Sequence, residues 1–217
     1  MDRYETALDS VPSDRFDDLD PARREAVFDA AMQAFGRDGY KRAMTEDIAR
    51  DAGMSKGLLF FYFHNKRDLY LRLVDYLMDK ITDIVVDEGF WEINDYFELM
   101  LYAGRKKSAV MQRFPHLLDF CVRAYYPEHR DVRARMNAWT QVQVDAMWQR
   151  FFKNVRLDRF RDDVSIRHVN ELLIWLADGY LHQVRMRGET LDLDDMLEQM
   201  EEWCAVLRSW AYKEEYR

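Results

Sequence analysis

The stretch TEDIARDAGMSKGLLFFYFHNKRDL, Thr45 to Leu69, decides the fold of this sequence. Its centre, Leu58 to Phe63, consists of apolar or aromatic residues with no polar break. A continuous apolar run of this length is compatible with a buried strand or with part of a buried helix, and periodicity alone does not separate the two. The residues on either side of the run therefore have to decide between them.

The residues before the run predict a short helix. Thr45 is a typical N-cap, and Glu46 and Asp47 lie in the first turn, where the helix dipole favours acidic side chains. Ala52 and Gly53 end the helix after about two turns, because glycine readily adopts the left-handed conformation that follows a helix.

The apolar run lies between two further cap signals. Ser55 is an N-cap, and Asn65 begins the next helix with Asp68 three residues later, as in a capping box. The run therefore reads as a short helix rather than a strand. Two short helices joined by a tight turn at Gly53 make a helix-turn-helix, whose second helix enters the major groove of DNA.

The composition is that of a globular protein. The chain has 217 residues, of which 48% are hydrophobic and 33% are charged, enough for one large domain or two small ones. A net charge of −8 argues against a general nucleic-acid binder. However, residues 41–72 carry seven basic and four acidic side chains. Local rather than net charge decides whether a surface meets phosphates, so DNA binding by this segment is consistent with the charge.

Other signals point to a cytoplasmic protein without a cofactor. Cys121 and Cys204 have neither metal-type spacing nor the pattern of a disulfide framework. The N-terminus lacks the basic and apolar regions of a signal peptide, and no segment approaches the roughly 20 apolar residues of a membrane span. We therefore expect a cytoplasmic location, no cofactor and no metal.

The rest of the chain predicts an all-α fold. Residues 1–20 carry seven acidic and two basic side chains, and we interpret residues 1–19 as a disordered acidic leader. Asp20-Pro21 is a helix start signal. Helical patterns are predicted over about 21–37, 66–89, 91–112, 115–126, 128–155, 163–187 and 192–213.

Thr45 to Leu69 resembles the DNA-binding signature of the TetR family of bacterial transcriptional regulators. The family pattern is roughly Thr-x-x-Ile-Ala-x-x-Ala-Gly-(Val/Met)-Ser-x-Gly-(Thr)-(Leu/Ile)-Tyr-x-(His/Tyr)-Phe-x-x-Lys-x-x-Leu. The matching residues are Thr45, Ile48, Ala49, Ala52, Gly53, Met54, Ser55, Gly57, Leu59, Tyr62, Phe63, Lys66 and Leu69. The chain departs from the pattern at Leu58 and Phe60, where the family usually has threonine and tyrosine, so neither residue offers a hydroxyl to a phosphate.

The resemblance implies an architecture and a function. We expect a three-helix helix-turn-helix DNA-binding domain over residues 20–65 and a larger helical ligand-binding and dimerisation domain over 66–217. Such a protein is a homodimer that binds a palindromic operator in double-stranded DNA. A repressor released by a small apolar or amphipathic effector is the leading reading, and an activator of the same family is the alternative. The effector's identity stays open.

The resemblance also assigns DNA contacts. Tyr62 and Lys66 are expected on phosphates, while Lys56 is expected at base edges, because lysine suits guanine O6 and N7. Leu59 and Phe63 are expected in the core. The full expected DNA-binding set is Thr45, Ser55, Lys56, Gly57, Phe60, Phe61, Tyr62 and Lys66.

The C-terminal part holds the expected ligand pocket and dimer surface of the family. Aromatic and methionine side chains at helical spacing usually form core, so only some of them are expected to line a pocket. The pocket candidates are Tyr96, Met100, Phe120, Tyr125, Trp139, Trp148 and Trp175. The dimer-interface candidates on the last two helices are Leu176, Tyr180, Trp203, Leu207 and Trp210.

An enzyme on a helical scaffold is the competing class of function. The chain has five histidines, but it contains no Glu-x-x-His pair and no His-Glu-x-x-His motif. The acidic run Asp17 to Asp20 resembles a metal-binding cluster only superficially, and no pairing of a nucleophile with a base emerges. We therefore predict that the protein is not an enzyme.

Overall fold

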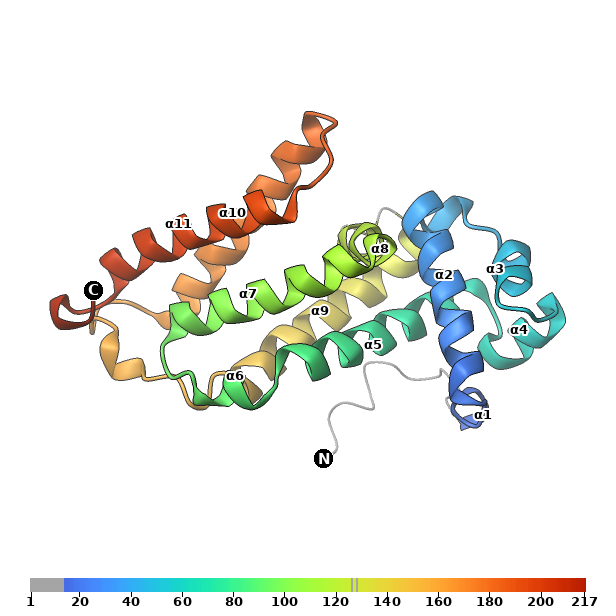
Figure 1. The fold of residues 1–217 in the computed structure, drawn as a ribbon, viewed down its shortest axis with the longest axis horizontal. Helices are drawn as coiled ribbons and strands as arrows, with labels where there is room; N and C mark the ends of the chain where they lie inside the picture. Colours follow the sequence, from blue (N-terminus) through green and yellow to red (C-terminus); the bar gives the residue numbers. More distant parts are fainter. Residues whose placement is uncertain (1–13, 126, 128) are drawn as a thin grey trace. The chain divides into compact units, whose positions relative to one another are not determined.

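The structure is a computed structural model that describes residues 14–125, 127 and 129–217, except for the side chains of 14, 15, 113, 115, 139–141 and 143–149 (Figure 1). The described residues are almost entirely helical and contain a single isolated β-bridge, between Phe160 and Tyr212. The predicted all-α fold is therefore confirmed. None of the described helices is both long and apolar enough to cross a membrane.

The chain divides into two compact units, 1–82 with 113–148 and 83–112 with 149–217. Because residues 113–148 return to the helix-turn-helix, this division by contacts differs from the expected one at residue 65. The helices that lie in or begin in the first unit are α1 (Asp14–Asp17), α2 (Pro21–Arg42), α3 (Thr45–Asp51), α4 (Lys56–Phe63), α5 (Lys66–Val85), α8 (Pro115–Tyr125) and α9 (Arg130–Arg150).

The start of α2 is as predicted, and the helix is interrupted close to its predicted end. The Asp20 carboxylate accepts the Arg23 N–H at 3.3 Å, and Pro21 occupies the first turn. The helix was expected to end at about residue 37, whereas helical structure continues to Arg42 across a kink at Gly39. Gly39 has φ 72°, a left-handed conformation that glycine adopts without the steric penalty of a Cβ.

Helix α8 packs tightly on α2, and this contact brings the later segment into the first unit. A Cβ at Gly36 of α2 would lie 2.9 Å from the His116 carbonyl oxygen, so the approach requires glycine. Arg123 of α8 also donates from Nε to the Gly36 carbonyl at 2.7 Å. Helix α8 is thereby bonded to the backbone of α2.

Helix α1 anchors the N-terminal segment in the same unit. Phe16 is only 2% exposed, and its ring centroid lies 4.5 Å from that of Phe63. Asp17 accepts a hydrogen bond from the Arg72 guanidinium at 2.6 Å. The end of the expected leader is therefore an ordered part of the helix-turn-helix unit, while residues 1–13 lie outside the described residues.

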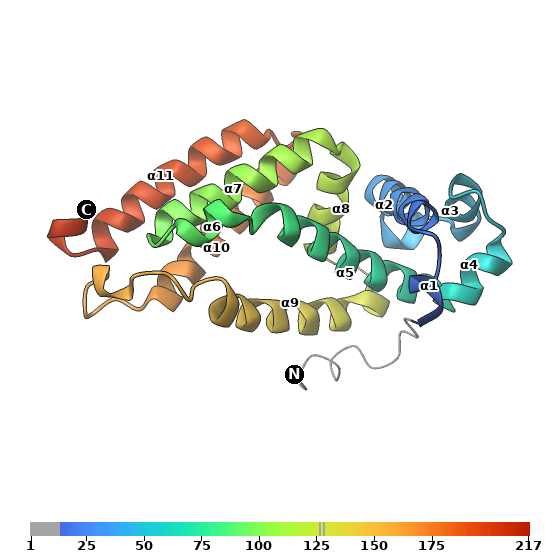
Figure 2. The ribbon, with the colours of Figure 1, turned by 60° about the horizontal axis from the view of Figure 1, so that its bottom comes forward.

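The second unit ends in a helical hairpin. Its helices are α6 (Glu88–Glu92), α7 (Tyr96–Arg113), η1 (Leu157–Arg159), α10 (Ile166–Met186), α11 (Leu193–Ala211) and η2 (Glu214–Tyr216). Helices α10 and α11 pack against each other and are the last two long helices of the chain (Figures 1 and 2). The turn between them contains Gly188, where the sequence predicted the break. Gly188 has φ 68°, which ends α10 in a left-handed turn.

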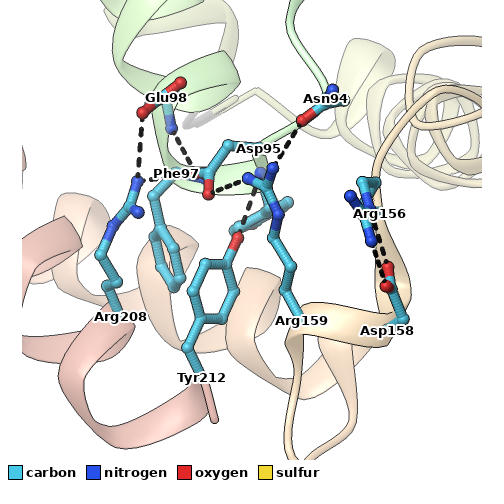
Figure 3. Close-up of polar contacts among 10 residues, drawn as sticks. Asn94, Asp95, Phe97, Glu98, Arg156, Asp158, Arg159, Arg208 and Tyr212 are labelled. Atoms are coloured by element: carbon cyan, nitrogen blue, oxygen red, sulfur yellow. Dashed lines mark hydrogen bonds and ion pairs between the residues drawn. The ribbon is translucent and has the colours of Figure 1, made fainter. Parts of the chain in front are cut away.

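A buried carboxylate ties the second unit together (Figure 3). Asp95 is 2% exposed and accepts hydrogen bonds from Arg159 at 2.8 Å and Arg208 at 2.7 Å. It also accepts the backbone N–H groups of Phe97 and Glu98, which begin α7. One side chain thus caps α7 and joins it to η1 and α11.

Candidate nucleic-acid interface

The turn between α3 and α4 has helix-turn-helix geometry. Gly53 has φ 66°, and the Met54 N–H donates to the Ala49 carbonyl at 2.9 Å, which closes the end of α3. The Ser55 hydroxyl oxygen accepts the Leu58 N–H at 3.2 Å. The predicted glycine turn and the predicted Ser55 cap are both confirmed.

Helix α4 has one buried and one exposed face. Leu59 and Phe63 are 1% and 2% exposed, as predicted for core residues. Lys56, Gly57 and Phe61 lie on the exposed face, and Phe61 is 51% exposed. The unbroken apolar run is thus divided by helical periodicity into a core-facing row and an outward row.

The remaining aromatic residues of α4 are held at the edge of the buried face. Tyr62 is half-buried, with ring centroids of Phe16 and Phe61 at 5.9 and 5.3 Å. Phe60 is also half-buried, and the Lys56 ammonium lies 5.6 Å from its ring centroid. The sequence reasoning missed Phe16, because one aromatic residue among acidic ones gives no periodic signal.

Thr45 does not cap α3, contrary to the prediction. Met44 occupies the N-cap position without a side-chain hydrogen bond, and Thr45 is the first helical residue. The Thr45 side chain is buried, and its hydroxyl donates to the Glu46 carboxylate at 3.3 Å instead of accepting a backbone N–H. A contact between Thr45 and a phosphate stays a prediction.

The start of α5 has the predicted cap and an unexpected anchor. Asn65 accepts the Asp68 N–H at 3.0 Å and donates to the Asp68 carboxylate at 2.7 Å. Lys66 donates to the Lys41 carbonyl at 3.2 Å, and its ammonium lies 5.1 Å from the Tyr40 ring centroid. Partial burial lowers the pKa of Lys66. Lys66 thus joins α5 to the end of α2.

Lys56 is exposed but has an intramolecular partner. Its Nζ donates to Oε1 of Glu46 at 2.5 Å, and each of the two side chains is about half exposed. The hydrogen bond from Lys56 lowers the pKa of the Glu46 carboxyl. Sequence reasoning assigned Glu46 no role beyond the helix dipole, because nothing local indicates a partner ten residues away on the next helix.

Two pocket candidates have the partners of ordinary core residues. Tyr96 is fully buried in the second unit, and its hydroxyl donates to Asn170 at 2.8 Å. Phe120 is buried in the first unit, with its ring centroid 5.3 Å from that of Tyr70 and 6.5 Å from that of Phe35. Neither side chain needs a ligand to explain its burial.

The other pocket candidates differ in how far their side chains are exposed to solvent. Met100 is half-buried, whereas Tyr125 and Trp175 are at least half exposed. Trp139 and Trp148 belong to α9, but their side chains lie outside the described residues. A ligand pocket lined by this set stays a prediction.

The dimer-interface candidates lie on the α10–α11 hairpin. Leu207 is buried within the unit, whereas Leu176 and Trp210 are exposed. Tyr180 and Trp203 are half-buried, with ring centroids 6.0 Å apart.

Within the described part of the chain, no cluster of three or more His, Cys, Asp or Glu side chains is arranged to hold a metal ion.

Known proteins resemble this chain in two ways. A family model matches the helix-turn-helix, and one relative aligns with most of the chain. Residues 27–73 match the family model for bacterial regulatory proteins of the tetR family. The HTH-type transcriptional repressor AcnR of Corynebacterium diphtheriae is 26% identical over 183 residues, which cover 83% of this chain and 90% of that protein. The HTH-type transcriptional regulator BetI of Rhizobium meliloti is 35% identical over 68 residues, 31% of this chain and 34% of that protein.

Solved structures share the fold. The fatty acid degradation regulator FadR of Bacillus halodurans has a TM-score of 0.69 at 17% identity, covering 85% of this chain and 97% of that one. The SmeT–triclosan complex has a TM-score of 0.69 at 18% identity, covering 90% and 94%. With the helix-turn-helix described above, the family-model match confirms the predicted resemblance to the TetR family over residues 27–73, and the relatives that match bear the names of transcriptional regulators rather than of enzymes.

Proposed function

We propose that this protein is a ligand-responsive repressor, which binds a palindromic operator as a homodimer and leaves it when a small apolar or amphipathic effector binds. The observation that carries the proposal is the division of α4 into two faces. Lys56, Gly57 and Phe61 lie on its exposed face, while Leu59 and Phe63 on the opposite face are buried in the core. The repressor function named for the AcnR relative supports the direction of regulation.

The DNA contacts follow from the positions on α4 and α5. Lys56, at the first turn of α4, reads base edges, and Phe60 offers its ring to a thymine methyl group. Tyr62 and Lys66 contact phosphates, with the backbone N–H groups at the start of α5. Because Leu58 and Phe60 lack hydroxyls, binding depends more strongly on Lys56, Tyr62 and Lys66.

The α10–α11 hairpin supports a homodimer. Trp175, Leu176, Val206 and Trp210 are between 39% and 69% exposed, although all four are large and apolar. A Cβ at Gly179 would have no neighbour within 4 Å, so this face of α10 is open to the approach of a second helix. Exposed apolar side chains gathered on adjacent helices are typical of an interface. The dimer would place two recognition helices about 34–36 Å apart, one DNA turn.

Effector control follows from the bonding of α8 to α2. Phe120 and Tyr125, two of the pocket candidates, lie on α8. Because Arg123 bonds α8 to the Gly36 carbonyl, an effector that displaces α8 also displaces α2 and weakens operator binding by linkage. A solved structure of the same fold is a complex with triclosan, which supports a small-molecule effector.

The proposal is tested by selecting bound duplexes from a randomised DNA pool with the purified protein. We expect a palindromic motif from the wild type. Lys56→Ala should relax one base position of each half-site, at a cost of about 1–3 kcal/mol, because base-edge contacts have that value. Tyr62→Phe should weaken binding to all sequences.

The matched control is Lys80→Ala, which removes a lysine of α5 that pairs with Glu25 at 3.2 Å. This variant should bind the selected motif as the wild type does. The proposal is wrong if the wild type enriches no motif, or if Lys56→Ala and Tyr62→Phe both bind the motif with full affinity. A reporter gene placed behind the selected motif then distinguishes repression from activation.

A further inference from the structure

We infer that Glu46 is a positioning residue for DNA recognition, which holds the Lys56 ammonium toward base edges and away from backbone phosphates. The inference rests on the proposed function, since it assigns the sequence preference of the same interface to a residue that does not itself contact a base. Three side chains carry it, Thr45 and Glu46 in the first turn of α3 and Lys56 in the first turn of α4.

The Glu46 carboxylate is held from two sides. Oε1 accepts from Lys56 Nζ at 2.5 Å, and Oε2 accepts from the buried Thr45 hydroxyl at 3.3 Å. Thr45 and Lys56 belong to different helices of the helix-turn-helix. The carboxylate is therefore a fixed acceptor at the N-terminal end of the recognition helix, and it determines where the flexible lysine side chain ends.

The pairing leaves Lys56 able to read a base. An ammonium has three N–H donors, and Glu46 takes one of them. The two others remain for guanine O6 and N7, the acceptors that lysine contacts in the major groove. The Lys56 ammonium also lies 5.6 Å from the Phe60 ring centroid, which further limits its reach.

Without the carboxylate, Lys56 would become a general phosphate contact. A free lysine at the edge of a DNA-binding surface is attracted to phosphates whatever the sequence, and this attraction makes up most of non-specific binding. Glu46 opposes it twice, because its negative charge repels phosphates and its hydrogen bond retains the ammonium. It should therefore lower non-specific affinity more than operator affinity.

The size of the effect follows from the exposure of the pair. The Lys56 and Glu46 side chains are 49% and 52% exposed, so solvent screens their attraction. Exposed pairs of this kind change an equilibrium by about twofold to fivefold. We expect non-specific affinity to rise by that factor when the charge of Glu46 is removed, and we expect the rise to shrink at high salt.

The test compares four variants in the full-length protein: Glu46→Gln, Lys56→Ala, the double variant, and Asp47→Asn. Asp47 is the matched control, because it is the next acidic residue on α3 but pairs with Arg50 at 2.7 Å instead of with Lys56. For each variant, motifs are selected from randomised duplexes, and affinities are measured for the wild-type motif and for a duplex of random sequence.

We expect Glu46→Gln and Lys56→Ala to lose preference at the same base position while shifting non-specific affinity in opposite directions. Glu46→Gln should bind the random duplex about twofold to fivefold more tightly. Lys56→Ala should bind it more weakly. In the Lys56→Ala background, Glu46→Gln should have no further effect on the motif.

Two results would overturn the inference while leaving the proposed function intact. One is a Glu46→Gln motif identical to that of the wild type. The other is a Glu46→Gln variant indistinguishable from Asp47→Asn, which would mean that only net charge matters. If the wild type itself selects no motif, the proposed function fails, and the inference fails with it.

Discussion

Replacing Phe16 by alanine should weaken the packing of the recognition helix α4 against the core. Phe16 is 2% exposed, and its ring centroid lies within 6 Å of the Phe63 and Tyr62 centroids, at 4.5 and 5.9 Å. Both of these residues belong to α4. The substitution thus removes an aromatic ring that packs against the helix proposed to enter DNA.

The loss in the free energy of unfolding depends on whether α1 stays packed after the substitution. A rigid cavity left by a buried phenylalanine costs about 3–5 kcal/mol. However, α1 has only 4 residues, and its Asp17–Arg72 ion pair is partly exposed and worth about 0–1 kcal/mol. We therefore expect α1 to detach, which limits the loss to the burial free energy of the ring, about 1.5–3 kcal/mol.

The assay is urea unfolding of the full-length protein. The matched control is Phe61→Ala, the same change at a ring on the same unit that is 51% exposed. Phe61→Ala should change the free energy of unfolding by no more than about 0.5 kcal/mol. Equal destabilisation by the two substitutions would refute the role assigned to Phe16.

Three further changes test the second unit. Asp95→Ala removes the buried carboxylate to which Arg159 and Arg208 both donate, so the free energy of unfolding should fall by about 3–5 kcal/mol in urea titrations. A loss below about 1 kcal/mol would contradict this. Val206→Asp places a charge on the exposed apolar face of α11 and should shift sedimentation toward the monomer, and an unchanged dimer would place the interface elsewhere. The hydrogen bond from Lys106 lowers the pKa of Asp87 from 3.8 to about 2. Its stabilisation relative to Asp87→Asn should therefore be full above pH 3.8 and disappear as pH falls through about 2; a constant difference in acid unfolding would refute this.

The helix-turn-helix could be predicted in detail because its signals are local. The Ser55 and Asn65 caps each bond to a backbone N–H three residues away, and Gly53 needs only its own left-handed φ. The division of α4 into a buried row with Leu59 and Phe63 and an outward row follows from helical periodicity alone. A sequence carries such information within a few residues.

Local signals were less reliable where two structures compete. Thr45 has the side chain of an N-cap, yet its hydroxyl bonds to Glu46 and the helix begins one residue earlier than a Thr45 cap implies. The two glycines after α2 were expected to stop the helix, and Gly39 does interrupt it with a left-handed φ, but a further short helical segment continues to Arg42.

The sequence by itself determined the all-α fold, the turn at Gly53 and the faces of the recognition helix, because caps and periodicity act over one or two helical turns. The tertiary structure alone decided that Phe16 completes the DNA-binding unit, that Glu46 holds Lys56, and that Asp95 gathers two arginines from distant segments. Ion pairs and ring contacts of this kind depend on which surfaces meet after the helices pack. The spacing of residues along the chain does not show which surfaces these are.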